Sequence, residues 1–323
     1  MKIALALAGA SLCLALLACQ QPAPQTTTSA QDAVPIWAFP INPPNAAPPP
    51  ADDGARLRLA GSTLSFTRSQ TRDPHAPPDW RPHDHPPMPD IVAHGRLPSV
   101  MACGYCHLPT GDGRPENARI AGLSEAYITA QMAAFKSGAR GEAVQGRLPH
   151  SAMTAIARAV TDDEVAAAAR YFSALTPHSF VRVVETQIVP KTHVAGWVLT
   201  PDADGATEPL GDRIVEVPDN FDTFEMRDPQ ARYIAYVPTG AVARGAAYVA
   251  SHACRSCHGE QLTGASTAPS LAGRSPTYIV RQLYDFETGA RGGGNSALMR
   301  PLVQGMSNAD RIAVAAYLAT LKP

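Results

Sequence analysis

The pattern of apolar and polar residues predicts helices in two separate stretches of this 323-residue chain. Within residues 124–138, and again within 275–289, a tyrosine, a glutamine and a phenylalanine follow one another at every fourth position, which places them on one face of a helix. A serine suited to be an N-cap begins each run, and a glycine suited to end a helix closes it. The caps are Ser124 and Ser275, and the terminating glycines are Gly138 and Gly289.

A further helix is predicted after each of these two. Residues 161–164, Thr-Asp-Asp-Glu, have the form of a capping box and precede an alanine-rich run that ends near Leu175. Residues 307–310 carry a looser version of the same signal ahead of a run to Leu321. We therefore expect three or more helices in each stretch and a mainly α fold.

Residues 178–240, between the two helical stretches, have a different pattern. Apolar and polar positions alternate over residues 181–189, and residues 213–218 have the composition of a short strand. The segment carries five basic and ten acidic residues, whereas residues 241–323 carry eight basic and four acidic ones. We expect a small, acidic, β-containing connector beside a basic second helical domain.

The chain before the first helical stretch is rich in proline. From Gln20 to about Pro50 it consists largely of proline, alanine, threonine and glutamine, and it lacks the apolar residues needed to fold. We expect a disordered Pro-rich N-terminal tether there, then an extended segment, with helix beginning near Ile91. Because prolines separate the four histidines of this segment, a solvated chain is favoured over a copper or zinc site. These histidines are His75, His83, His85 and His94.

The N-terminus has the pattern of an export signal. Met1 and Lys2 precede an apolar run over residues 3–17 that is too short for an ordinary membrane span. The run ends in Leu-Leu-Ala before Cys19, which resembles the lipobox of bacterial lipoproteins, so lipid on Cys19 is expected to anchor the protein to a membrane. An ordinary secretory signal, with Cys19 discarded or free, is the alternative. By analogy with Gram-negative lipoproteins, Gln20 weakly favours the outer membrane.

An internal repeat relates the two helical stretches. Cys-Gly-Tyr-Cys-His at residues 103–107 recurs as Cys-Arg-Ser-Cys-His at residues 254–258, which is 151 positions later. The second copy then lacks five residues, so that Met153 corresponds to Met299. The repeat predicts a division into 1–18 (signal peptide of lipoprotein type), 19–90 (tether and extended segment), 91–177 (first domain), 178–240 (connector) and 241–323 (second domain).

Cys-x-x-Cys-His provides what covalent haem attachment requires. Two thiols are spaced to add to the two vinyl groups of the porphyrin, and the imidazole that follows can reach the iron. A zinc ribbon needs cysteine pairs much closer in sequence, and a thioredoxin-like disulfide should lie beside a βαβ pattern that this sequence lacks. Two covalently bound haem c groups are therefore predicted. The attachment residues are Cys103, Cys106, Cys254 and Cys257, and the proximal iron ligands are His107 and His258.

With these motifs the chain resembles the bacterial two-haem cytochromes c built from tandem class I cytochrome c domains. The resemblance covers both repeats, about half of the chain. It implies that a methionine in the loop before the last helix is the sixth iron ligand, and Met153 and Met299 occupy that place. Met306 is the rival in the second copy, although its counterpart in the first is Val160.

The resemblance also implies how the proximal histidines are oriented. In the family, a backbone carbonyl, usually that of a proline, accepts the second ring N–H. Pro269 stands at this place in the second copy and Ala118 in the first, so we expect the two haems to differ. Arg140 and Arg291 are placed either to pair with haem propionates or to lie solvated at helix ends.

Two irons with six ligands each leave no position for a substrate, so the expected function is the transfer of single electrons between protein partners. The expected donor is a dehydrogenase or a quinol-oxidising complex, the acceptor is an oxidase or reductase, and the location is the periplasm. A cytochrome subunit of a membrane-bound dehydrogenase is one alternative. A dihaem peroxidase or sulfur-compound oxidoreductase is the enzymatic one. With 27 basic and 28 acidic residues, the chain gives no support to a nucleic-acid partner.

Overall fold

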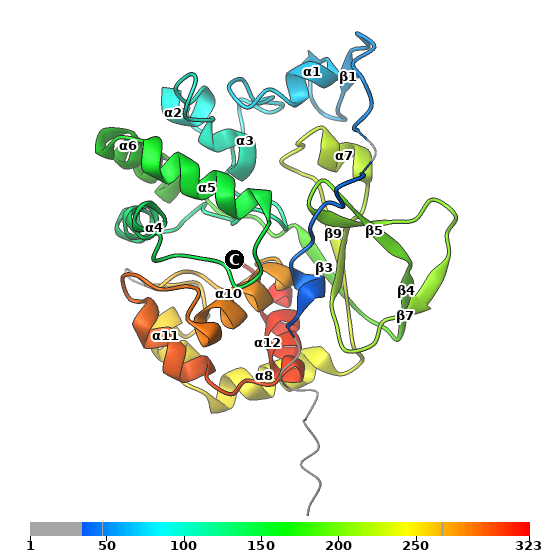
Figure 1. The fold of residues 1–323 in the computed structure, drawn as a ribbon, viewed down its shortest axis with the longest axis vertical. Helices are drawn as coiled ribbons and strands as arrows, with labels where there is room; N and C mark the ends of the chain where they lie inside the picture. The colour runs from blue at the N-terminus through cyan, green and yellow to red at the C-terminus, as the bar shows by residue number, and fades with distance from the viewer. Residues whose placement is uncertain (1–33, 47, 266–267) are drawn as a thin grey trace, which may run out of the picture.

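The computed structural model describes residues 34–46, 48–265 and 268–323, and the expected signal peptide, Cys19 and part of the tether lie outside the described residues. Two helical halves lie one above the other, and a β-containing part lies beside both (Figure 1). The first half appears in cyan and green, and the second in yellow, orange and red. Among the described residues, no helix has the length and apolar character needed to cross a membrane.

The two helical halves contain corresponding helices in the same order. In the first half these are α2 (Asp90–Ala93), α3 (Cys103–His107), α4 (Glu125–Ser137), α5 (Leu148–Ala159) and α6 (Asp162–Ser173). In the second half they are α8 (Ala241–Ser251), α9 (Cys254–His258), α10 (Pro276–Thr288), α11 (Ser296–Val303) and α12 (Asn308–Thr320).

The helix ends follow the predicted capping signals. Ser124 and Ser275 accept backbone N–H groups at the starts of α4 and α10, and both helices end in a left-handed glycine, Gly138 or Gly289. Capping boxes with both hydrogen bonds start α6 and α12. Because caps act through residues within one turn of the helix end, these boundaries could be predicted from sequence and are confirmed.

The connector is built from strands. A three-stranded sheet has the order β3–β9–β8, with β3 parallel to β9 and β8 antiparallel to it. Two antiparallel pairs, β4 with β7 and β5 with β6, extend from this sheet, and α7 (Phe221–Glu225) precedes β9. The strands are β3 (Val181–Glu185), β4 (Ile188–Pro190), β5 (Thr192–Ala195), β6 (Val198–Pro201), β7 (Thr207–Pro209), β8 (Val215–Pro218) and β9 (Tyr233–Val237). The predicted class, mainly α with a β-containing connector, is confirmed.

Each helical half has its own apolar core. In the second half, α8 crosses α12 at Gly245, where an added Cβ would overlap the backbone carbonyl of Ala313. This close approach requires glycine and lets two long helices pack over most of their length. In the first half the corresponding helix, α2, has four residues where α8 has 11. The two copies therefore differ in the helix that precedes the Cys-x-x-Cys-His motif.

Residues 48–90 pack against the rest of the protein, which their proline-rich composition does not predict. The segment contains the paired strands β1 (Leu57–Arg58) and β2 (Ser65–Phe66) and the short helix α1 (Arg68–Thr71). Trp80 is 1% exposed, stacks edge-on against Phe66, and donates its indole N–H to the carbonyl of Met226 at 2.7 Å. The expectation of a solvated histidine run is wrong for His85, whose side chain is 4% exposed and lies 3.2 Å from Asp79.

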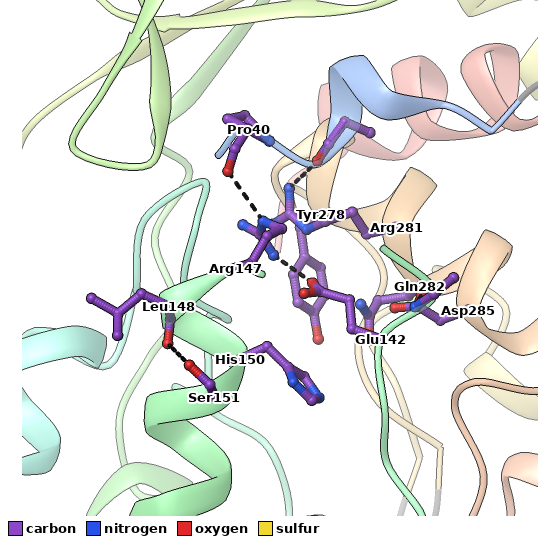
Figure 2. Close-up of polar contacts among 12 residues, drawn as sticks. Pro40, Glu142, Arg147, Leu148, His150, Ser151, Tyr278, Arg281, Gln282 and Asp285 are labelled. Atoms are coloured by element: carbon purple, nitrogen blue, oxygen red, sulfur yellow. Dashed lines mark hydrogen bonds and ion pairs between the residues drawn. The ribbon is translucent and has the colours of Figure 1, made fainter. Parts of the chain in front are cut away.

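Residues 36–40, which precede this segment, bridge the two helical halves. The 3₁₀ helix η2 (Ile36–Ala38) lies against α10, where Arg281 donates to the carbonyl of Ala38 at 2.7 Å. Two residues further on, the carbonyl of Pro40 accepts a 3.4 Å bond from Arg147, which precedes α5 (Figure 2). The N-terminal segment thus joins the first half to the second through backbone carbonyls.

Glu216 on β8 attaches the connector to α10, and its removal should destabilise the fold. Its buried carboxylate accepts from the hydroxyl of Ser275 at 2.7 Å and from the backbone N–H of Thr277 at 3.1 Å. Glu216→Ala should lower the free energy of unfolding by about 2 kcal/mol, because both donors stay buried without an acceptor. Denaturant unfolding of the haem-loaded protein measures this.

Glu208 supplies the matched control, since its pair with Arg213 at 2.6 Å is about one-third exposed. Glu208→Ala should change the free energy of unfolding by less than about 1 kcal/mol. Equal losses in the two variants would contradict the special role assigned to Glu216.

Candidate functional site

One cavity of about 940 Å³ lies between the two helical halves and is lined by both Cys-x-x-Cys-His motifs. Its volume is near the upper end of the roughly 300–1,000 Å³ range of small-molecule sites. The structure therefore brings together the residues that the sequence singled out. Those lining the cavity are Cys103, Cys106, His107, Met153, Cys254, Cys257, His258 and Met299.

The two proximal histidines are held in the same way. The Nδ1 atom of His107 lies 2.8 Å from the carbonyl oxygen of Ala118, and that of His258 lies 2.8 Å from the carbonyl oxygen of Pro269. Because a carbonyl can only accept, Nδ1 carries the proton, and Nε2 keeps its lone pair for a metal. Burial lowers the pKa of both imidazoles, which favours this neutral form. The bond to the Ala118 carbonyl is as short as the bond to the Pro269 carbonyl, so the replacement of proline by alanine does not lengthen it.

The four cysteines of the motifs are free thiols on two single-turn helices, α3 and α9. Burial raises the pKa of Cys103 to about 12 and also raises the pKa of Cys254. Among the described residues, no group of three or more histidine, cysteine, aspartate or glutamate side chains is arranged to hold a metal ion. The donors at each site are thus one imidazole and two thiols, which suits a porphyrin that brings its own iron and accepts the sulfurs.

Four methionines line the cavity, and Met132, on α4, has no matching methionine in the other repeat. Met153 lies on α5 and Met299 on α11, and both are half-buried. Met306 also lines the cavity but is 6% exposed and belongs to the apolar core of the second half. The positions of Met153 and Met299 agree with the repeat, and their role as ligands stays a prediction.

Arg140 and Arg291 lie at the centre of a symmetric network between the halves. Arg140 donates to Gln131 of its own half at 2.7 Å and to Tyr278 of the other half at 3.3 Å. Arg291 makes the matching bonds, to Gln282 at 2.6 Å and to Tyr127 at 2.9 Å. Backbone hydrogen bonds on either side, such as that from the N–H of residue 141 to the carbonyl of residue 290, pair the two segments as an antiparallel bridge. The halves are joined by equivalent residues of the two repeats.

This network carries positive charge that the protein itself does not neutralise. Within the part of the chain that the structure describes, neither Arg140 nor Arg291 forms an ion pair with a carboxylate. Burial alone would raise the pKa of Tyr278, but these guanidinium groups and that of Arg274 lower it to about 8. A bound group with carboxylates fits such a site, and a porphyrin with two propionates is one. Solvated helix-end cations, the alternative left open by the sequence, do not describe Arg291, which is 7% exposed.

Two features of the site were not predicted from the sequence: the hydrogen bonds of this network between the two halves, and the position of His150. The signal that could have found the network was the recurrence of Tyr127 and Gln131 as Tyr278 and Gln282, which is also consistent with packing. His150 lies on α5 (Figure 2). It lines the cavity, and its Nε2 atom lies 3.1 Å from the carbonyl oxygen of Arg140. Its counterpart in the second half is Ser296, so the repeat gave no indication of it.

Comparisons with known proteins agree with this site. Residues 242–322 match the family model for cytochrome c. The chain is 41% identical over 68 residues to cytochrome c-554(548) of Halomonas halodenitrificans, covering 21% of this chain and 82% of that protein. It is 26% identical to cytochrome c4 of Azotobacter vinelandii, covering 69% of this chain and 85% of the relative. It is 27% identical to a thiosulfate dehydrogenase electron acceptor of Thiomonas intermedia, covering 69% of this chain and 79% of that protein.

The repeated motif, the cavity shared by both copies and these similarities lead to one assignment. The relative with 41% identity is matched over most of its length, and the cytochrome c4 similarity extends across both helical halves. The chain belongs to the cytochrome c family, as a two-domain member that binds two haem c groups covalently and transfers electrons.

Proposed function

We propose that each helical half is one haem domain with its own set of ligands. Cys103 and Cys106 attach the first haem, whose iron is held by His107 and Met153. Cys254 and Cys257 attach the second, held by His258 and Met299. The observation that carries this proposal is the pair of equivalent histidines, each with Nδ1 bound to a carbonyl at 2.8 Å and both lining one cavity. The haem domains are 91–177 and 241–323, with the connector at 178–240.

The proposed ligands explain why the protein is a carrier. Haem iron supplies a reversible one-electron couple. The thioether of methionine is a soft ligand that favours the reduced metal, so it raises the reduction potential relative to a second histidine. A histidine and a methionine would together complete the coordination of each haem iron, which would leave no position open for oxygen, peroxide or a sulfur compound. This favours outer-sphere electron transfer over the activity of a dihaem peroxidase or sulfur-compound oxidoreductase.

A ligand-binding assay tests this assignment directly. Both ferric haems should show the near-infrared methionine-to-iron charge-transfer band. Titration of the ferric protein with peroxide, and of the ferrous protein with carbon monoxide, should leave the spectra unchanged. A haem that binds either molecule would overturn the carrier assignment and support the enzymatic alternative.

Arg140 and Arg291 are proposed to bind the haem propionates. Each replacement, Arg140→Gln or Arg291→Gln, should lower the midpoint potentials by on the order of 50 mV, because an unneutralised propionate stabilises ferric iron. Spectroelectrochemical titration measures the change. Arg170 is an exposed arginine of the first half, so Arg170→Gln serves as the control and should leave both midpoints within error. Equal shifts in all three variants would exclude a specific role for the network.

The protein is proposed to act outside the cytoplasm, in the periplasm, with lipid on Cys19 attaching it to the outer membrane. Its partners are redox proteins. The names of two relatives, the thiosulfate dehydrogenase electron acceptors of Thiomonas intermedia and Stutzerimonas stutzeri, favour a dehydrogenase of sulfur compounds as the donor. An oxidase or reductase is the proposed acceptor. The same names support the alternative in which the chain is the cytochrome subunit of a membrane-bound dehydrogenase.

A further inference from the structure

The two Cys-x-x-Cys-His motifs have identical chemistry but different exposure. In the first motif and the residue before it, from Ala102 to His107, every side chain is buried or half-buried. Around the second motif, His252, Ala253, Ser256 and Cys257 are all exposed. The second Cys-x-x-Cys-His motif, at its cysteine end, is therefore more exposed than the first.

The N-terminal segment and the connector cover the first motif. The N–H of Ala102 donates to the carbonyl of Pro74 at 2.9 Å, and the hydroxyl of Tyr105 donates to the carbonyl of Arg72 at 3.2 Å. From the connector, Arg227 places its guanidinium 3.5 Å from the centre of the Tyr105 ring and donates to the Tyr105 carbonyl at 2.7 Å. Two segments far apart in the sequence thus close over this face.

The loops that follow the motifs differ in the same way. Residues 111–116 are all buried, and the connector holds them through Arg114, which donates to the carbonyl of Phe224 at 3.1 Å and lies over its ring. Asp112 accepts the backbone N–H of His178 at 2.8 Å. At the corresponding place in the second copy, Leu262 is buried, but residues 263 and 265 are exposed. The first loop is therefore more enclosed than the described part of the second.

Most of the exposed residues that line the shared cavity belong to the second half. In the second half, the exposed residues that line the cavity are His252, Ala253, Ser256, Cys257, Ala265, Gly294, Asn295, Leu298 and Leu302. Leu298 and Leu302 are 64% and 46% exposed. Their counterparts by the repeat are Ala152, which is half-buried, and Ile156, which is 8% exposed. In the first half, the exposed lining residues are Ala126 and Ala130, on α4 rather than at the motif.

An exposed cation lies on the same helix as these leucines. Arg300 lies on α11 between Leu298 and Leu302 and makes no ion pair with any described residue. The exposed carboxylate of Glu260, which follows the second motif, is paired with Arg255 at 3.4 Å. An apolar surface with a cation at its edge fits a partner with an apolar centre and an acidic rim.

We propose that the surface around Cys257, Leu298 and Leu302 is where a one-electron redox protein with an acidic docking face binds, and that the first haem exchanges electrons with partners through the second. The inference rests on the proposed haem sites. The residues of the second motif, Cys254, Cys257 and His258, would hold the haem whose ferric iron takes one electron from the partner's redox group. Those of the first motif, Cys103, Cys106 and His107, would hold the haem that receives this electron next, so that the second iron would return to the ferric state.

The test uses the complete protein with both haems and two small anionic probes. In stopped-flow reduction by Fe(EDTA)²⁻, we expect one phase with a rate proportional to reductant concentration, while reduction of the first haem shows no bimolecular phase of its own. Leu298→Glu should slow the bimolecular phase about fivefold at low ionic strength, and salt should remove the effect. Leu97 is 71% exposed and does not line the cavity, so Leu97→Glu is the matched control and should change the rate less than twofold.

Binding is measured separately by nuclear magnetic resonance with hexacyanochromate(III). This paramagnetic anion should broaden signals of Ser256 and Leu302 and leave those of Tyr105 sharp. Two bimolecular reduction phases, equal slowing in the control, or broadening centred on Tyr105 would overturn the proposal. A protein that dithionite cannot reduce, or that holds fewer than two haems, would instead contradict the proposed haem sites themselves.

Discussion

Replacing both cysteines of the second motif, Cys254→Ala with Cys257→Ala, is expected to halve the covalently bound haem, from two groups per chain to one. The reason is chemical, since thioether attachment needs these two sulfurs, and the other two described cysteines, Cys103 and Cys106, belong to the first motif. The second half should also lose stability, because cavity-lining residues of its core, such as Val303 and Leu318, would face an empty space. Haem content per chain, measured as the pyridine complex against protein concentration, checks the result.

Ser256→Ala provides the control within the same motif. Ser256 is exposed, and its hydroxyl donates to the nearby carbonyl of Ala253 and makes a long contact of 4.0 Å with the sulfur of Cys257. This variant should keep two haems and normal spectra. If the double cysteine variant also kept two covalent haems, the assignment of Cys254 and Cys257 as attachment residues would be wrong.

Loss of either methionine ligand is expected to lower one midpoint potential and leave the other nearly unchanged. Met153→Ala and Met299→Ala should each produce a decrease on the order of 0.1 V, well within the roughly 0.8 V range that axial ligands span. The physical reason is the loss of a soft sulfur that favours ferrous iron. Redox titration of each variant, with loss of its charge-transfer band in the ferric state, measures the effect haem by haem.

Met306 is the informative comparison in the second half, because it also lines the cavity. Met306→Ala should lower stability through its buried side chain while keeping both charge-transfer bands. If Met306→Ala removed a band and Met299→Ala did not, the ligand of the second haem would be Met306. An unchanged titration in Met153→Ala would remove that residue from the first site.

In the Met153→Ala variant, the spectrum should also be checked for His150 as a replacement ligand. It lies one turn away on α5, lines the same cavity, and has no histidine counterpart in the second half. Its Nε2 atom is engaged by the carbonyl oxygen of Arg140 at 3.1 Å, which keeps that nitrogen away from a metal in the native protein. The two methionine variants therefore need separate spectra, since His150 lies on the same helix as Met153, whereas the second imidazole that lines the cavity in the second half, His252, precedes the Cys-x-x-Cys-His motif.

Much of the candidate site could be predicted from the sequence because its chemistry is local. Two thiols and an imidazole within five residues define an attachment site whatever surrounds them, and the repeat identified the equivalent methionines. The same holds for helix ends, where Ser124 and Ser275 act on N–H groups three residues away. The Ala118 carbonyl also lies in a short loop after its motif, and the prediction that it can accept the His107 N–H is confirmed.

The surroundings of the two sites depended on contacts that sequence spacing does not reveal. Trp80 is buried against the carbonyl of Met226, which is 146 positions away, and proline-rich composition gives no sign of this. From the sequence alone, Arg140 and Arg291 could equally lie solvated at helix ends. The tertiary structure excludes this for Arg291, because partners from the other repeat contact both arginines.

The sequence by itself determined that this chain carries two equivalent haem-attachment motifs, each in a helical unit with predictable ends, because those features arise from residues within a few positions of one another. Only the tertiary structure decided that the two motifs are unequal. Residues 72–77 and the loop after α7 cover the first motif, whereas the second stays at the surface. The physical reason is that burial is set by segments packing from distant parts of the chain, and these segments have no counterpart in the repeat.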